Sequence, residues 1–271
     1  MNTPPTPTIS ICPLSSGSSG NSILIRSDSC AVLVDCGMTG KAAENELAQA
    51  GISPEKIDAI IVTHEHIDHI SGVGIMCRRY KIPVYATLGT WKAMINSIGK
   101  IDTSLIRYIA AEVPFEICGT KFHPFSTSHD AAESIGLIFS KNGKYGAVAT
   151  DLGTVTKHIF DLLSPCSIAV LEANHDEVML KNGPYPMHLK ERILSDHGHL
   201  SNKLCGALCA KLVREGKLRQ IMLGHLSTDN NTPRRAYETV ANSIDATGFK
   251  VGEDVSLYIA QRYCMSEELI D

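Results

Sequence analysis

The stretch THEHIDHISG at residues 63–72 restricts the possible folds of this chain more than any other feature. It holds four groups that can bind a metal within six positions, namely His64, His66, Asp68 and His69. The apolar run KIDAIIVT before it predicts a buried strand, and ISGVGIMCRRY after it predicts a helix. The four side chains are therefore expected where a strand turns into a helix.

The spacing within HEHIDH allows these groups to face two neighbouring ions. In an extended chain, side chains two positions apart point to the same side, so His64 and His66 can converge on one ion. Asp68 and His69 lie where the chain enters the helix and can face a second ion. Imidazole nitrogen and carboxylate oxygen suit zinc, manganese or iron. Because these few groups cannot fill two coordination shells, further ligands must come from elsewhere.

Three more residues of ligand type stand at the ends of predicted strands. His129 follows an apolar run in FSTSHD, Asp151 does so in GAVATDLG, and His225 does so in IMLGHLS. A single histidine at a strand end is usually structural, but three such positions together with HxHxDH favour a metal site. We expect all seven side chains to meet.

Composition and the order of the expected elements indicate an α/β fold. Hydrophobic residues make up 44% of the 271 and charged residues 20%, which is typical of a globular chain with a sizeable core. Strand-like segments dominate both halves with helices between them, and this pattern predicts two sheets packed face to face. Residues 1–8, rich in proline and threonine, are expected to form a mobile arm, and residues 9–271 a single domain.

Charge and cysteine usage bear on location and partners. A net charge of −4 lacks the basic excess of a dedicated duplex-DNA binder, yet it allows a nucleic acid that is held mainly by metals. Nine irregularly spaced cysteines without a CxxC pair favour reduced thiols. There is no secretory signal and no apolar run near the ~18 residues that span a bilayer. We expect a cytoplasmic protein with no membrane partner, and the sequence leaves its oligomeric state open.

These motifs resemble those of the metallo-β-lactamase fold superfamily. HxHxDH with a downstream His, Asp and His carries the likeness to the superfamily. A finer likeness, to the YycJ/WalJ-type bacterial hydrolases, is carried by SSGSSGNS, LVDCG, SHDAAESIG, TDLG, EANHD followed by MLKNGPYPMHLKERIL, GHLSN and LGHLSTDNN. It covers the chain from about residue 9 to residue 231. Ile67 departs from the pattern, because relatives usually carry a small or polar residue there.

The resemblance implies an αββα sandwich, two mixed β-sheets flanked by helices, with the site at one edge between the sheets. It also implies three ligands for one divalent ion, three for a second ion and one bridging ligand: His64, His66 and His129; Asp68, His69 and His225; and Asp151. Asp35 resembles the family's aspartate that orients a ligand histidine by accepting its other N–H. The alternative is that Asp35 is an ordinary turn carboxylate.

The two expected metal ions and the resemblance together indicate a hydrolase. Two ions about 3.5–4 Å apart can share a water and lower its pKa, so a metal-bridged hydroxide would attack the substrate. YycJ/WalJ-type proteins are associated with DNA exonuclease activity, which implies a dinuclear phosphodiesterase acting on single-stranded DNA ends. The alternatives are a hydrolase of a small metabolite, either a cyclic phosphodiester or a thioester, and a regulatory metal protein with little turnover.

The general acid is less well defined by the sequence. Many phosphodiesterase relatives place a histidine for this role before the last ligand, and His199 occupies a similar position. His197 and His175 compete with it, and Asp68 is a second candidate catalytic residue.

Substrate contacts are equally open. Asn174 and His175 follow a strand end and are expected near the cleft, and Ser18 lies in a glycine-rich loop that could approach a phosphate. Lys190 and Arg192 could meet phosphate too, but charge on a helix surface is the simpler interpretation.

Overall fold

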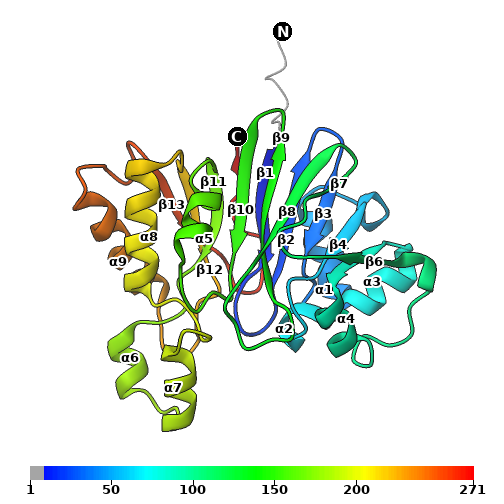
Figure 1. The fold of residues 1–271 in the computed structure, drawn as a ribbon, viewed down its shortest axis with the longest axis horizontal. Helices are drawn as coiled ribbons and strands as arrows, with labels where there is room; N and C mark the ends of the chain where they lie inside the picture. Colours follow the sequence, from blue (N-terminus) through cyan, green and yellow to red (C-terminus); the bar gives the residue numbers. More distant parts are fainter. Residues whose placement is uncertain (1–8) are drawn as a thin grey trace.

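The computed structural model describes residues 9–271, and the arm expected at residues 1–8 lies outside this range. Two seven-stranded β-sheets pack face to face, and helices cover the outer face of each sheet (Figure 1). The predicted αββα sandwich is therefore confirmed.

The first sheet has the strand order β14-β1-β2-β3-β4-β5-β6. Its strands are β1 (Ile9–Ser15), β2 (Ser22–Ser27), β3 (Ala31–Val34), β4 (Ala59–Ile61), β5 (Val84–Thr87), β6 (Ile106–Ile109) and β14 (Leu269–Ile270). Strands β1 to β3 are antiparallel neighbours, whereas β3 to β6 run parallel. The sequence analysis missed β14, because a strand of two residues shows no periodicity.

The second sheet has the order β13-β12-β11-β10-β9-β8-β7. Its strands are β7 (Phe115–Ile117), β8 (Thr120–Ser126), β9 (Ile135–Lys141), β10 (Lys144–Ala149), β11 (Ile168–Glu172), β12 (Gln220–Gly224) and β13 (Ser256–Ile259). Strands β7 to β10 form an antiparallel meander, and β10 to β13 run parallel. Both sheets are thus mixed.

Helices on the outside belong to two sets (Figure 1). Beside the first sheet lie α1 (Gly40–Gln49), η1 (Pro54–Lys56), α2 (Ile67–Ile70), α3 (Val73–Tyr80), α4 (Leu88–Met94) and η2 (Thr103–Leu105). Beside the second lie α5 (Lys157–Leu163), α6 (Glu177–Asn182), α7 (Met187–Leu194), α8 (Asn202–Glu215) and α9 (Pro233–Asp245). No helix among residues 9–271 is both long enough and apolar enough to cross a membrane.

Buried apolar side chains form three clusters that match these layers. One lies between the sheets and includes Ile11, Phe139 and Val170. A second joins the first sheet to α1, α3 and α4, and a third joins the second sheet to α5, α8 and α9. Burial of apolar surface on both faces of each sheet is the main stabilising term for such a fold.

The helix expected after HEHIDH is interrupted, and the loop after β3 packs against the interruption. Residues 71 and 72 separate α2 from α3. The N–H of Gly72 donates to the Cys36 carbonyl at 2.8 Å, and a Cβ at Gly72 would lie 2.3 Å from the Met38 carbonyl oxygen. The loop after β3 therefore packs directly on the break, which only glycine permits.

Candidate metal centre

Three histidines form one side of the site. His64 and His66 follow β4, and His129 follows β8. The Nδ1 atom of His66 lies 3.1 Å from His64 Nε2 and 3.3 Å from His129 Nε2. His64 and His129 are buried, so these rings converge inside the protein, where one ion could accept a nitrogen from each.

An aspartate and two histidines form the other side. Asp68 and His69 lie on α2, and His225 directly follows β12. Asp68 Oδ2 lies 3.6 Å from His69 Nε2 and 3.7 Å from His225 Nε2. These three groups could hold a second ion.

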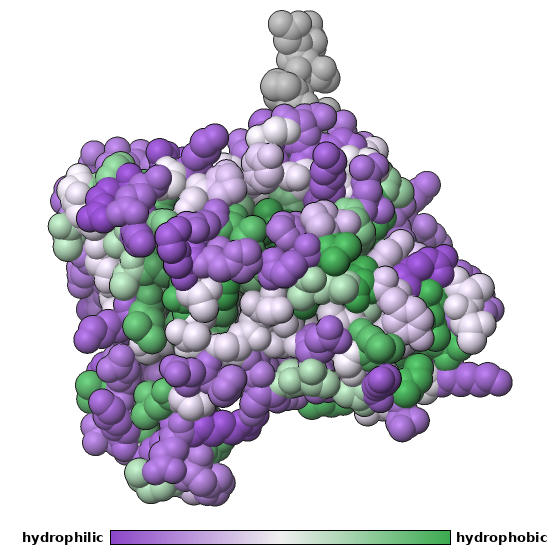
Figure 2. All heavy atoms as spheres, viewed as in Figure 1, coloured by the Kyte–Doolittle hydropathy of each residue, from purple (hydrophilic) through white to green (hydrophobic). Residues whose placement is uncertain are grey.

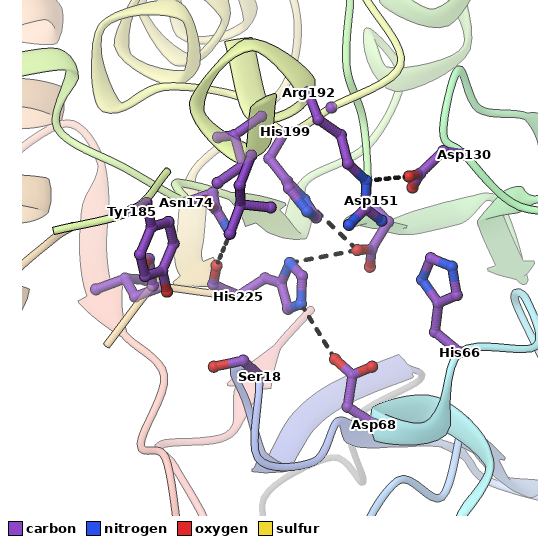
Figure 3. Close-up of a pocket in the computed structure, with 15 residues that line it drawn as sticks. Ser18, His66, Asp68, Asp130, Asp151, Asn174, Tyr185, Arg192, His199 and His225 are labelled. Carbon is purple, nitrogen blue, oxygen red and sulfur yellow. Dashed lines mark hydrogen bonds and ion pairs between the residues drawn. The ribbon is translucent and has the colours of Figure 1, made fainter. Parts of the chain in front are cut away.

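Asp151, just beyond β10, connects the two sides (Figure 3). Its Oδ2 lies 3.4 Å from His69 Nε2, and its Oδ1 lies 3.6 Å from His129 Nε2. One carboxylate therefore faces a member of each trio. The structure brings together all seven residues that the sequence predicted to meet.

The backbone is strained at three of these strand ends. Asp35, Asp151 and His225 have φ angles of 60°, 56° and 55°. A non-glycine residue in this left-handed region costs of the order of 1–3 kcal/mol and persists where the surroundings enforce it. Each turns the chain sharply after β3, β10 or β12, which directs its side chain into the site.

Asp35 supports the first-sheet half of the site. Its Oδ2 lies 2.7 Å from His69 Nδ1, and its Oδ1 accepts the Thr63 N–H at 2.8 Å. The Thr63 hydroxyl also donates to Asp35 Oδ2 at 2.8 Å and lies 3.0 Å from His64 Nδ1. The carboxylate therefore fixes the ring of His69 and, through Thr63, meets that of His64.

Glu172, the last residue of β11, supports the second-sheet half, and the sequence analysis missed it. Its Oε1 lies 2.8 Å from both His199 Nδ1 and His225 Nδ1, and its Oε2 accepts the N–H groups of Leu152 and Leu200 at 2.9 and 3.1 Å. Both oxygens are thus engaged, so Glu172 orients histidines. A signal for it was present in the sequence. In SIAVLEA an apolar run leads to the carboxylate of Glu172, just as GAVAT leads to that of Asp151.

Burial and neighbouring charges shift the pKa values of the site residues in different directions. Burial opposes ionisation of Glu172, but His199 and His225 outweigh it and lower the pKa of its carboxyl group. Burial likewise disfavours the charged form of His69, but Asp35 and then Asp151 raise its pKa to about 9. His64 shows the opposite balance, because burial and then His69 lower its pKa well below the usual value.

Two buried atoms show that the donor set fits divalent ions. Asp151 Oδ2 and His225 Nε2 have no hydrogen-bond partner among residues 9–271. Leaving such an atom unpaired costs about 1–3 kcal/mol or more, so it usually has a ligand. Imidazole nitrogens with carboxylate oxygens are ligands for zinc, manganese and iron. The residues present therefore fit the expected cofactor.

A cavity of about 250 Å³ opens beside the site, with openings to solvent. Among the residues predicted for catalysis or substrate contact, its wall includes Ser18, Asp68, Asn174 and His199, but not His175 or His197. Asn174 is already engaged, since its Nδ2 donates to the His225 carbonyl at 2.9 Å.

The structure places His175, which was expected near the cleft, behind the cavity wall. Its side chain is 1% exposed and lies outside the cavity wall, and burial lowers its pKa to about 4. His197 is exposed in the loop after α7 and also lies outside the wall. Of the three histidines considered for the general acid, His199 is the one that faces the cavity.

Arg192 differs from the simple helix-surface charge expected of it. It lines the cavity from α7, and Figure 3 shows its side chain directed toward Asp130, with which it forms an ion pair. Lys190 on the same helix fits the surface interpretation, because it lies outside the cavity wall and its Nζ donates to the Lys181 carbonyl at 2.8 Å.

Known proteins resemble this chain in sequence and in fold. A family model described as the metallo-beta-lactamase superfamily matches residues 16–138. The chain is 38% identical to "Exodeoxyribonuclease YycJ" of Bacillus anthracis, covering 90% of this chain and 92% of that protein. It is 39% identical to "Exodeoxyribonuclease WalJ" of Streptococcus pneumoniae, covering 90% and 91%. The metallo-beta-lactamase fold protein YhfI from Bacillus subtilis superposes with a TM-score of 0.69 at 14% identity, covering 95% of this chain and 98% of that one.

Proposed function

Because this chain belongs to the metallo-beta-lactamase superfamily and, within it, to the YycJ/WalJ type, we propose that it is a dinuclear phosphodiesterase that shortens DNA from single-stranded ends. Membership makes it a metal-dependent hydrolase of the nuclease or phosphodiesterase type. The proposal adds the number of ions, which are zinc, manganese or iron, and the form of the DNA.

The position of Asp151 is the observation that carries the dinuclear part. Its two oxygens face His129 on one side and His69 on the other. A carboxylate placed between two ligand trios is suited to bridge two ions, whereas a single ion would leave one trio without a role. The unpaired Oδ2 supports the same assignment.

The residues divide the work of holding cofactor and substrate. Bound divalent ions supply Lewis acidity and lower the pKa of water. One ion would be held by His64, His66 and His129. The other would be held by Asp68, His69 and His225, and Asp151 would contact both. Asp35 and Glu172 fix ring orientations, so that each ligand nitrogen faces inward.

We assign the general acid to His199. Glu172 accepts a hydrogen bond from its Nδ1 at 2.8 Å, and the ring lines the cavity. Burial lowers the pKa of His199, but the Glu172 carboxylate outweighs it, so the net shift is upward. A ring that keeps its proton beside the cavity can donate it to the departing oxygen of a phosphodiester.

The size of the cavity supports action on the end of one strand. Its volume of about 250 Å³ lies below the ~300–1,000 Å³ of most small-molecule sites. Because a duplex is much bulkier than such a space, we expect DNA to enter it as the end of a single strand. The same dimensions also suit a small cyclic phosphodiester, which is the alternative substrate.

Product analysis tests the proposal. The metal-loaded protein is incubated with end-labelled single strands, blunt duplexes, a cyclic dinucleotide and a thioester. We expect stepwise shortening of the single strands, slower action on the duplexes and no thioester cleavage. Turnover of the cyclic dinucleotide alone would establish the alternative, and faster shortening of blunt duplexes would contradict the preference for single strands.

A further inference from the structure

Helices α6 and α7 form a projecting hairpin that closes one side of the cavity. The hairpin extends below the sheets in Figure 1, and its surface in Figure 2 is mostly hydrophilic. Tyr185, Leu189, Arg192 and Ile193 from this segment line the cavity. The Tyr185 hydroxyl donates to Asp229 Oδ2 at 2.7 Å, so the hairpin is tied to the loop after β12.

Arg192 is the one lysine or arginine that lines this cavity in the described part of the chain. The other charged groups of the wall, apart from histidines, are the carboxylates of Asp68, Asp130 and Asp151. A cation on the projecting hairpin has no part in holding a metal. Its charge is suited to an anionic part of the substrate.

Asp130 connects Arg192 to the metal site. Its Oδ2 pairs with Arg192 Nε, and its Oδ1 lies 3.4 Å from His129 Nε2. The guanidinium is therefore held one side chain away from the first ligand trio, so an anion bound to it would lie next to the scissile group and not on it.

We propose that Arg192 binds the phosphate adjacent to the scissile one and thereby makes the enzyme prefer substrates with two neighbouring phosphates over an isolated phosphodiester. This inference rests on the proposed function, since it names a further determinant of substrate choice at the same site. The planar guanidinium fork matches phosphate oxygens bidentately, which a lysine ammonium cannot do.

The ion pair with Asp130 does not prevent this role. The side chain of Arg192 is 52% exposed and that of Asp130 is 32% exposed. Pairs this accessible to solvent contribute little to stability, so little is lost when the guanidinium turns toward a substrate. Asp130 acts as a positioning residue that holds the Arg192 side chain beside the first ligand trio.

The test compares substrates that differ by one phosphate. Thymidine dinucleotides with free ends, with a 5′-phosphate and with a 3′-phosphate are assayed beside bis-p-nitrophenyl phosphate. We expect the wild type to favour one phosphorylated form through a lower KM. Arg192→Ala should remove about tenfold to a hundredfold of that preference, in line with a charge-assisted hydrogen bond. Its rate with bis-p-nitrophenyl phosphate, which has no second phosphate, should fall much less than its rate with the phosphorylated dinucleotide.

Two further variants define the role. Lys190→Ala, on the same helix but outside the cavity, should retain the preference, and Arg192→Lys should restore part of it. Titration calorimetry measures the affinity for the same dinucleotides and therefore tests the inference even if none of them is hydrolysed. Absence of hydrolysis would count against the proposed function alone. Equal affinity of wild type and Arg192→Ala for the phosphorylated form would overturn the inference, as would an equal loss toward bis-p-nitrophenyl phosphate.

Discussion

The two sheets contribute to the metal centre in different ways. The first sheet supplies four of the seven proposed ligands from one short segment, HEHIDH, between β4 and the end of α2. The second supplies single residues from successive connections: His129 after β8, Asp151 after β10, Glu172 at the end of β11 and His225 after β12. The first half is a local motif, whereas the second exists only because β8, β10, β11 and β12 end at the same edge of the second sheet.

Each half also has its own buried carboxylate. Asp35 meets one ring, that of His69, and Glu172 meets two, those of His199 and His225. Because Glu172 supports both a proposed ligand and the proposed acid, the second half joins metal binding to proton transfer. In the first half, Asp35 supports only a proposed ligand, so variants of the two carboxylates can separate these roles.

The largest effect is expected for Asp151→Asn, because this residue connects the halves. The amide keeps the shape but loses the charge that two ions would share, so bound metal should fall and hydrolysis should drop to background. Elemental analysis and a bis-p-nitrophenyl phosphate assay of the same preparation measure both. Full occupancy with full activity would show that the halves act without a bridge.

His199→Ala should lower kcat for DNA by about 10²–10⁴-fold, the usual contribution of a general acid, and leave the metal content unchanged. The loss should be much smaller with bis-p-nitrophenyl phosphate, because p-nitrophenolate departs without a proton. Parallel kcat measurements with the two substrates show the difference. Loss of metal would instead make His199 a ligand, and equal losses on both substrates would reject the acid role.

Asp35→Asn and Glu172→Gln form a matched pair, one from each half. Each should weaken metal affinity or activity by about 10–100-fold, the range for groups that orient ligands. Only Glu172→Gln should also reduce the advantage that His199 gives with the poorer leaving group. Metal titrations and leaving-group series on both variants provide the comparison. Identical leaving-group profiles for the two variants would contradict a separate role for Glu172.

Chelation should have the smallest effect, on stability. Each ion at a hundredfold excess over its Kd stabilises a folded protein by about 2.7 kcal/mol, so removal of two ions should lower Tm by roughly 10–20 °C. The fold should remain, because the three apolar clusters do not depend on the site. Differential scanning calorimetry with and without chelator measures the shift, and global unfolding on chelation would show that the halves need the ions to pack.

The sequence predicted the first half and much of the fold because the information there is local. HEHIDH and the alternation of apolar runs with turns indicate their structures without knowledge of contacts. Two features of this half were not predicted. Strand β14 is too short to show periodicity, and the break between α2 and α3 depends on packing against Cys36.

The second half is predictable only in part. His129, Asp151 and His225 stood out as residue types. Glu172 had the same strand-end pattern, but nothing local in the sequence shows that its side chain lies beside two histidines. Arg192 appeared to be surface charge, since nothing local shows that α7 folds over the cavity. Its position depends on the hairpin contact at Tyr185 and on the partner Asp130.

The central claim is that both sheet edges enclose two divalent ions. Elemental analysis of the purified, metal-reconstituted protein tests it most directly, with His64→Ala and His225→Ala as variants of the two halves. The account predicts close to two ions per chain for the wild type and a clear loss in each variant. One ion per chain that survives either substitution would contradict it.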